Sequence, residues 1–153
     1  MEKVAIAADH GGFELKEDIK LFLKEIGYEP VDFGTHNNNS VDYPDFGIKV
    51  AEAVSRGDIQ KGILICGTGV GMSIVVNKFP DVRGALCNDI YTARMGRKHN
   101  DSNILILGGR VVGRGIAMEI VNTWMSTQFD GGRHQKRLDK IKELEDKIRK
   151  GWI

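Results

Sequence analysis

Five short apolar runs that alternate with helical patterns constrain the fold of this chain more than any other feature of its sequence. The runs are partly β-branched and are bounded by Gly, Asn or Asp, a pattern typical of buried strands. The segments between them carry apolar residues at helical spacing, clearest between Leu15 and Ile26. Strands are predicted at 4–9, 29–33, 62–66, 82–87 and 103–107, and helices near 15–26, 44–56, 71–78, 89–98, 114–127 and 134–150.

This alternation requires right-handed crossovers and produces a parallel sheet with helices on both faces. The predicted fold is an α/β, doubly wound three-layer sandwich with a five-stranded parallel sheet. We expect one domain over residues 1–153, a length that can bury a single core. The C-terminal helix at 134–150 has a thin apolar stripe among many charges, so we expect it at a subunit interface rather than in the core.

The balance of charge excludes some classes of partner. With 22 Lys and Arg residues against 21 Asp and Glu residues, the net charge is +1, so no overall field favours nucleic acid or a membrane surface. The N-terminal segment lacks the apolar region of a secretory signal, and no stretch approaches the roughly 18 apolar residues of a membrane span. We therefore expect a cytoplasmic protein in which Cys66 and Cys87 are free thiols.

Unusual residues stand at the ends of three predicted strands. The first strand ends in Asp9 and is followed by His10, the third runs into CGTGVG at 66–71, and the fifth is followed by two glycines and Arg110. Ligands of open α/β sheets bind beyond the carboxyl ends of the strands. These strand ends are therefore the candidate ligand site.

The glycine loop at 65–71 matches neither common nucleotide motif. Position 72 is Met where a dinucleotide fingerprint has glycine, and no Lys follows Gly71 as a P-loop requires. What remains is a helix N-terminus whose amides face an anion and whose glycines let the backbone approach it. The loop either holds an oxyanion or a phosphate, or is a tight turn with nothing bound.

The two cysteines differ in their surroundings. A helix N-terminus favours the thiolate form of a nearby thiol, which would make Cys66 reactive, although apolar neighbours would make it an inert core residue. No glycine loop follows Cys87, and we assign it to the core.

Other polar candidates come later in the chain. His99 and Asn100 precede the fifth strand. Arg133 and Arg137 are four residues apart and share one helix face, which suits bidentate phosphate binding. The alternative is a solvated basic turn.

Several stretches, among them AADHGGFELK, DYPDF, ICGTGVGMSI and FDGGRHQKR, occur together between residue 4 and about residue 140. In this combination the chain resembles the B-type ribose-5-phosphate isomerases, a family that includes galactose-6-phosphate isomerase subunits. The resemblance implies a cofactor-independent aldose–ketose isomerase of ribose 5-phosphate and ribulose 5-phosphate. It also implies a homodimer, in some cases paired into tetramers, and a flavodoxin-like strand order 2-1-3-4-5.

The resemblance further implies a role for each candidate residue and no metal ligand. Cys66 would be the base that moves a proton between C2 and C1 through a cis-enediolate, with Thr68 beside it. Asp9 and His99 would open the furanose ring, and Asn100 would assist at the enediolate. The remaining substrate contacts would come from Gly67, Gly69, Val70 and Gly71 at the enediolate and from His10, Arg110, Arg133 and Arg137 at the phosphate.

Two other functions stay open. A hexose-6-phosphate isomerase acting on allose 6-phosphate or galactose 6-phosphate would use the same proton transfer, and a non-catalytic sugar-phosphate-binding module could share the fold. Some family members use a nearby Glu as base in place of the cysteine. Here position 66 is Cys and the helix after the loop has no Glu, so the cysteine version is expected.

The predicted topology creates a geometric conflict within this site. Asp9 and Cys66 follow their strands, whereas His99 and Asn100 precede the fifth strand. In a parallel sheet these two groups lie at opposite edges. We therefore expect His99 and Asn100 to enter the site from a partner subunit.

Overall fold

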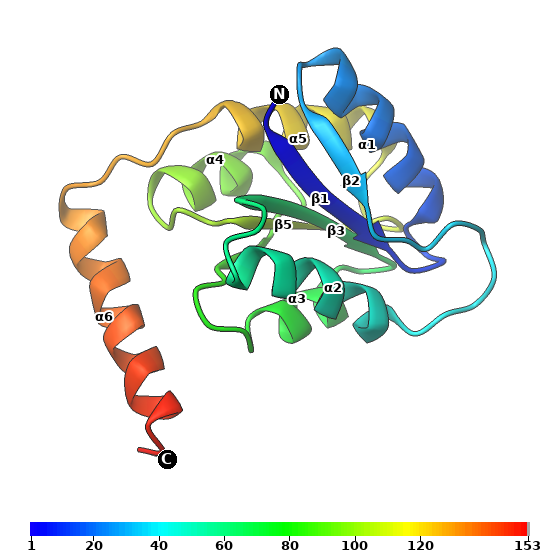
Figure 1. Cartoon of the computed structure of the whole chain (residues 1–153). Helices are drawn as coiled ribbons and strands as arrows, with labels where there is room; N and C mark the ends of the chain where they lie inside the picture. The colour runs from blue at the N-terminus through cyan, green and yellow to red at the C-terminus, as the bar shows by residue number, and fades with distance from the viewer. Residues whose placement is uncertain (153) are drawn as a thin grey trace.

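A five-stranded parallel sheet lies at the centre of the computed structural model, between two layers of helices (Figure 1). The structure describes residues 1–152, and Ile153, the last residue of the predicted domain, lies outside the described part. Each predicted strand and helix is confirmed, with ends that differ by at most two residues. The strands are β1 (Lys3–Ala8), β2 (Glu29–Asp32), β3 (Lys61–Cys66), β4 (Gly84–Leu86) and β5 (Ile104–Gly108). The helices are α1 (Phe13–Glu25), α2 (Tyr43–Ser55), α3 (Val70–Val76), α4 (Ile90–Lys98), α5 (Arg114–Ser126) and α6 (Arg133–Arg149).

The sheet has the order β2-β1-β3-β5-β4, so the expected order 2-1-3-4-5 is wrong at its last two strands. β5 is buried along its whole length and pairs with β3, whereas the three residues of β4 are half-buried and lie at the edge. The helix between these strands, α4, packs through Ala93 into the same core as α1 and α5. Crossover connections between parallel strands are right-handed. Because the connection from β4 to β5 crosses the face that α4 covers, it places β5 between β3 and β4.

Each helix layer buries one apolar face against the sheet. On one side, α1 contributes Leu15 and Leu23, two helical turns apart, and α5 contributes the fully buried Trp124. On the other side, α2 and α3 cover the sheet with side chains that include Val50 and Met72. The two cores hold β1, β3 and β5 side by side. No helix within residues 1–152 is both long and apolar enough to cross a membrane.

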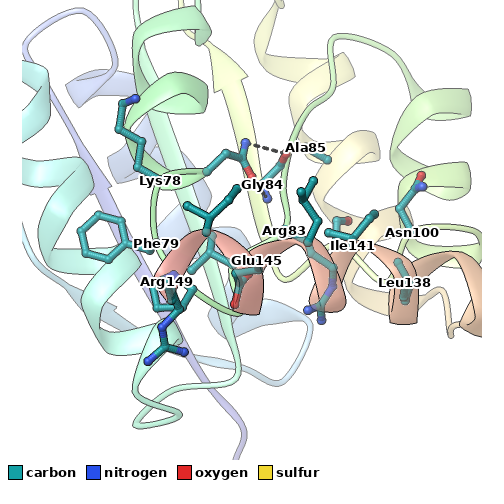
Figure 2. Close-up of a pocket in the computed structure, with 16 residues that line it drawn as sticks. Lys78, Phe79, Arg83, Gly84, Ala85, Asn100, Leu138, Ile141, Glu145 and Arg149 are labelled. Carbon is teal, nitrogen blue, oxygen red and sulfur yellow. Dashed lines mark hydrogen bonds between the residues drawn. The ribbon is translucent and has the colours of Figure 1, made fainter. Parts of the chain in front are cut away.

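α6 lies apart from the sandwich at the end of the chain (Figure 1). It contacts the sandwich at Asp81, whose amide donates to the Glu145 carboxylate at 3.0 and 3.1 Å and whose carboxylate accepts from Lys142 at 2.9 Å. A groove of about 700 Å³ separates α6 from the segment 77–85 (Figure 2). The apolar stripe of α6 lines this groove through Leu138, Ile141, Leu144 and Ile148.

Candidate functional site

The carboxyl ends of β1, β3 and β5 meet at one edge of the sheet because these strands are neighbours in the observed order. Cys66 at the end of β3 pairs with Gly108 at the end of β5. The amide of Gly109 donates to the Cys66 carbonyl at 2.8 Å, and the amide of Asp9 donates to the Ile65 carbonyl at 3.2 Å. Backbone hydrogen bonds therefore fix the site residues of three strands in one place.

Glycines let these strand ends approach one another closely. A Cβ atom on Gly109 would lie 2.6 Å from the carbonyl oxygen of Gly11, so a side chain cannot fit between the ends of β1 and β5. Gly69, which precedes α3, has a φ of 82°, a left-handed conformation that glycine adopts without strain. The glycine loop of the sequence is thus required by the geometry of the site.

The two polar residues after β1 are both held by backbone amides. The Oδ1 atom of Asp9, a residue that is 8% exposed, accepts a hydrogen bond from the amide of Gly11 at 2.9 Å. The Nδ1 atom of His10 accepts from the amide of Val41 at 3.1 Å. A ring nitrogen that accepts carries no proton, so the neutral His10 ring carries its proton on Nε2 and can donate from there.

The thiol of Cys66 and the hydroxyl of Thr68 come from the turn between β3 and α3. Cys66 is 5% exposed and packs into the core beneath α2 and α3. Thr68 is exposed, and its Oγ1 accepts from the amide of Val70 at 3.2 Å. That hydrogen bond leaves the hydroxyl proton of Thr68 as a donor to another group. The turn thus offers a buried thiol and an exposed donor two residues apart.

Two larger side chains border the glycine loop. The Nη1 atom of Arg110 lies 3.0 Å from the position that a Cβ atom on Gly67 would occupy. The ring of Tyr43 would lie 2.6 Å from a Cβ on Gly71. Tyr43 has no predicted role, although it stands in the stretch DYPDF just before Pro44, the second residue of α2. The sequence signal that could have identified Tyr43 is an aromatic residue at the start of a helix, together with a loop of glycines that leaves room for its ring.

His99 and Asn100 lie at the other end of the sheet. His99 follows the last residue of α4, and Asn100 comes before the strand β5. The first residue of β5, Ile104, pairs with Gly62, whereas Cys66 pairs with the last. At about 3.3 Å a residue, the length of β5 alone separates the two ends by roughly 13 Å. The chain therefore does not bring His99 and Asn100 to Cys66.

The basic turn at the start of α6 accompanies His99. Arg133 and Arg137 are exposed, while His134 between them is buried. The rings of His99 and His134 stack, with centroids 4.2 Å apart and planes 14° from parallel. A ligand atom of Asp130 lies within 4.8 Å of both imidazoles. Among residues 1–152 this is the one such group of possible metal ligands, and it lies away from Cys66.

The predicted site thus divides into two halves. One half, at the carboxyl ends of the strands, joins a thiol, a carboxylate and a guanidinium around backbone amides, a set that can move protons and bind an anion. The other half holds two stacked imidazoles, an amide and two guanidiniums. Its predicted residues are His99, Asn100, Arg133 and Arg137, and the structure adds His134.

The second cysteine belongs to the core. Cys87 is 1% exposed and packs in the cluster that contains α4 and α5. Burial raises the pKa of its thiol to about 11, so it stays protonated at neutral pH. This agrees with its assignment from the sequence.

Comparison with known proteins links this geometry to one family. A family model described as Ribose/Galactose Isomerase matches residues 4–141. Ribose-5-phosphate isomerase B of Escherichia coli is 46% identical over 147 residues, which cover 96% of this chain and 99% of that protein. The solved structure of ribose-5-phosphate isomerase B from Clostridium thermocellum is 58% identical, with a TM-score of 0.93 over 95% of this chain and 99% of the other. The type B ribose 5-phosphate isomerase of Trypanosoma brucei is 48% identical, with a TM-score of 0.91 over 94% and 99%.

Proposed function

Because the chain belongs to the ribose/galactose isomerase family, it is an aldose–ketose isomerase, and we propose that it interconverts ribose 5-phosphate and ribulose 5-phosphate without a cofactor. The observation that carries this proposal is the meeting of Asp9, Cys66 and Arg110 at one edge of the sheet. The reaction needs a base at the carbon to be deprotonated, a further proton-transfer group and a cation for the phosphate. These three side chains supply them.

In the proposed reaction, the thiolate of Cys66 takes the proton from C2 of the open-chain aldose and returns it to C1. Between the two transfers a cis-enediolate forms, and the proton of the C2 hydroxyl passes to the oxygen on C1. The loop at 67–71 and the hydroxyl of Thr68 lie beside Cys66 and stabilise the negative oxygen of this intermediate. Stabilisation of charge that exists only during the reaction raises the rate rather than the affinity for the substrate.

Ribose 5-phosphate is largely a furanose, and its ring must open first. In the proposal Asp9 takes the proton of the C1 hydroxyl, and His99 gives a proton to the ring oxygen as the bond from C1 to that oxygen breaks. Asn100 assists at the enediolate. The phosphate is bound by His10, Arg110, Arg133 and Arg137, since guanidinium groups form strong hydrogen bonds with phosphate.

These roles require two copies of the chain. His99 and Asn100 lie at the opposite end of the sheet from Cys66, and Arg133 and Arg137 lie with them. The proposed enzyme is therefore a homodimer in which each site takes these four residues from the other copy. The exposed apolar residues of α6 and the groove beneath them support this, because a second copy would cover them. The whole chain acts as one domain, and α6 lies at the subunit interface.

A cytoplasmic location completes the proposal. The proposed base must stay a free thiol, and both cysteines are free in the described structure. A reducing compartment keeps such a thiol from oxidising.

A coupled assay on three sugar phosphates tests the function. We expect the highest kcat/KM on ribose 5-phosphate and lower values on allose 6-phosphate and galactose 6-phosphate. The reason is that the relative and the two solved structures described above are named ribose-5-phosphate isomerases. A preference for either hexose phosphate would contradict the substrate. Dialysis against a strong chelator should leave the rate unchanged, and a loss that a divalent metal restores would contradict the cofactor-free mechanism.

A further inference from the structure

The imidazole of His134 covers one face of the His99 ring. Their centroids lie 4.2 Å apart and their planes are 14° from parallel. His134 is 7% exposed although both of its neighbours in the sequence are exposed. A side chain on a mostly charged helix that is buried only at this position is held there by a specific contact.

The chain builds this contact with a short turn that is tied to α4. The amide of Asp130 donates to the Lys98 carbonyl at 3.0 Å, which fixes the segment before α6 to the end of α4. Gly131 and Gly132 follow with φ values of 67° and 55°, and these conformations reverse the chain direction. The next turn places His134 on His99.

The stack is better suited to holding one ring than to binding a metal ion. Asp130 completes a His–Asp–His group with ligand atoms within 4.8 Å of one another. A bound ion lies in the plane of each imidazole, about 2.0–2.1 Å from the nitrogen. Two nearly parallel rings 4.2 Å apart cannot both meet this condition unless they leave the stack.

The charges around the pair favour an uncharged His134. Removal from water, then the neighbouring His99 and the guanidiniums of Arg133 and Arg137, lower the pKa of His134, and the carboxylate of Asp130 opposes this only in part. Two charged imidazoles in contact would repel each other. A neutral His134 therefore presents the face of an uncharged aromatic ring to His99.

We propose that His134 is a positioning residue that stacks on His99 and holds its ring in place for opening the furanose. This inference rests on the proposed function. It assigns His134 to one step only, the transfer of a proton from His99 to the ring oxygen as the C1 hydroxyl loses its own proton. The later transfer between C2 and C1 belongs to Cys66 and does not need His134.

The two steps can be measured separately because the two sugars differ in ring chemistry. Ribulose 5-phosphate cannot close a furanose on C2, since its C5 oxygen carries the phosphate. Incorporation of solvent deuterium at C1 of ribulose 5-phosphate therefore reports the Cys66 step alone, whereas conversion of ribose 5-phosphate also needs ring opening. Both rates are measured in the full-length chain for His134→Ala, His134→Phe and the exposed control Lys136→Ala.

We expect His134→Ala to lower kcat for ribose 5-phosphate by about tenfold to a hundredfold, while deuterium exchange stays within about twofold. His134→Phe keeps a flat ring in the stack and should recover most of the loss, and Lys136→Ala should change neither rate. An equal fall of both rates in both His134 variants, or no fall in either, would overturn the proposal. If the unmodified enzyme neither converts nor exchanges these sugars, the proposed function itself has failed.

Discussion

The guanidinium of Arg110 lies directly against the backbone of Gly67, the residue that follows Cys66. Nη1 of Arg110 is 3.0 Å from where a Cβ on Gly67 would stand, and the amide of Arg110 donates to the Gly67 carbonyl at 2.9 Å. The absence of a side chain at position 67 therefore lets a cation lie next to the proposed base. In the proposed reaction, this contact places the group that binds the phosphate beside the group that moves the proton.

Substitution of Gly67 should weaken substrate binding through Arg110. The methyl group of Gly67→Ala must push the guanidinium a few tenths of an ångström from its position. This weakens its charged hydrogen bond to phosphate, which is worth about 1.5–3 kcal/mol. We expect KM for ribose 5-phosphate to rise by about tenfold. Gly115→Ala is the matched control, because nothing lies within 4 Å of its Cβ position in α5. Equal KM values in the two variants would show that Arg110 does not bind the phosphate.

The two cysteines should respond oppositely to substitution. Cys66→Ala removes the proposed base and should lower kcat by about 10²–10⁴-fold or more. Cys87→Ala removes only a buried thiol whose pKa is about 11, and it should keep nearly full kcat. Iodoacetamide should inactivate the unmodified enzyme, and substrate should protect it. Near-normal turnover in Cys66→Ala would mean that the thiolate is not the base.

The two arginines of α6 should act on binding. We expect Arg137→Ala to raise KM for ribose 5-phosphate, because it removes a charged hydrogen bond worth about 1.5–3 kcal/mol, with a smaller effect on unphosphorylated ribose. Arg133→Ala should act in the same direction. An unchanged KM in both variants would make this segment a solvated basic turn.

A buried ion pair should control the acid stability of the fold. Lys16 is fully buried, and its Nζ lies 2.8 and 2.7 Å from the two carboxylate oxygens of Asp32. Burial alone would raise the pKa of Asp32, but hydrogen bonds from Lys16, Lys20 and the Gly34 amide outweigh it and hold the pKa at about 2. Asp32→Asn leaves the buried Lys16 with only the Glu17 carboxylate, 3.3 Å away, and should lower the free energy of unfolding by about 3 kcal/mol at pH 7.

The pH dependence of unfolding gives a second test of this pair. Because the pKa of Asp32 is lower in the folded chain than the value of about 3.9 in an unfolded one, its contribution is complete above about pH 5. It is lost as the pH falls from there through about 2. Denaturant unfolding should therefore show a smaller loss of stability over this range in Asp32→Asn than in the unmodified chain.

Asp18→Asn is the matched control, because it breaks an exposed pair with Arg114. It should lower the free energy of unfolding by less than about 1 kcal/mol.

The sequence predicted the elements of the fold better than their arrangement. Apolar runs and helical spacing located each strand, because burial of one face imposes that periodicity. The order of the last two strands was missed, since it depends on which face α4 covers, and Ala93 carries that contact. The available signal was that the run in β5, ILIL, is longer and entirely apolar, which suits a buried central strand, whereas β4 has only the three residues GAL and suits the edge.

The site was predictable where it follows directly from the ends of strands. Asp9, Cys66 and Arg110 meet as expected, because parallel strands end at the same edge. The stack of His134 on His99 could not be predicted, since it depends on the conformations of Gly131 and Gly132 and on the tie to α4. Contacts between segments joined by such turns have no periodic signature.

Subunit mixing tests whether each active site joins Cys66 of one copy to His99 of another. Homodimers of Cys66→Ala and of His99→Ala should each be nearly inactive. After reversible dissociation and random reassociation, half of the dimers are mixed, and each mixed dimer has one intact site and one doubly damaged site. The mixture should recover about a quarter of the activity of the unmodified enzyme. No recovery, with subunit exchange confirmed by a mass label, would place both residues of each site in one chain and contradict a site shared between two copies.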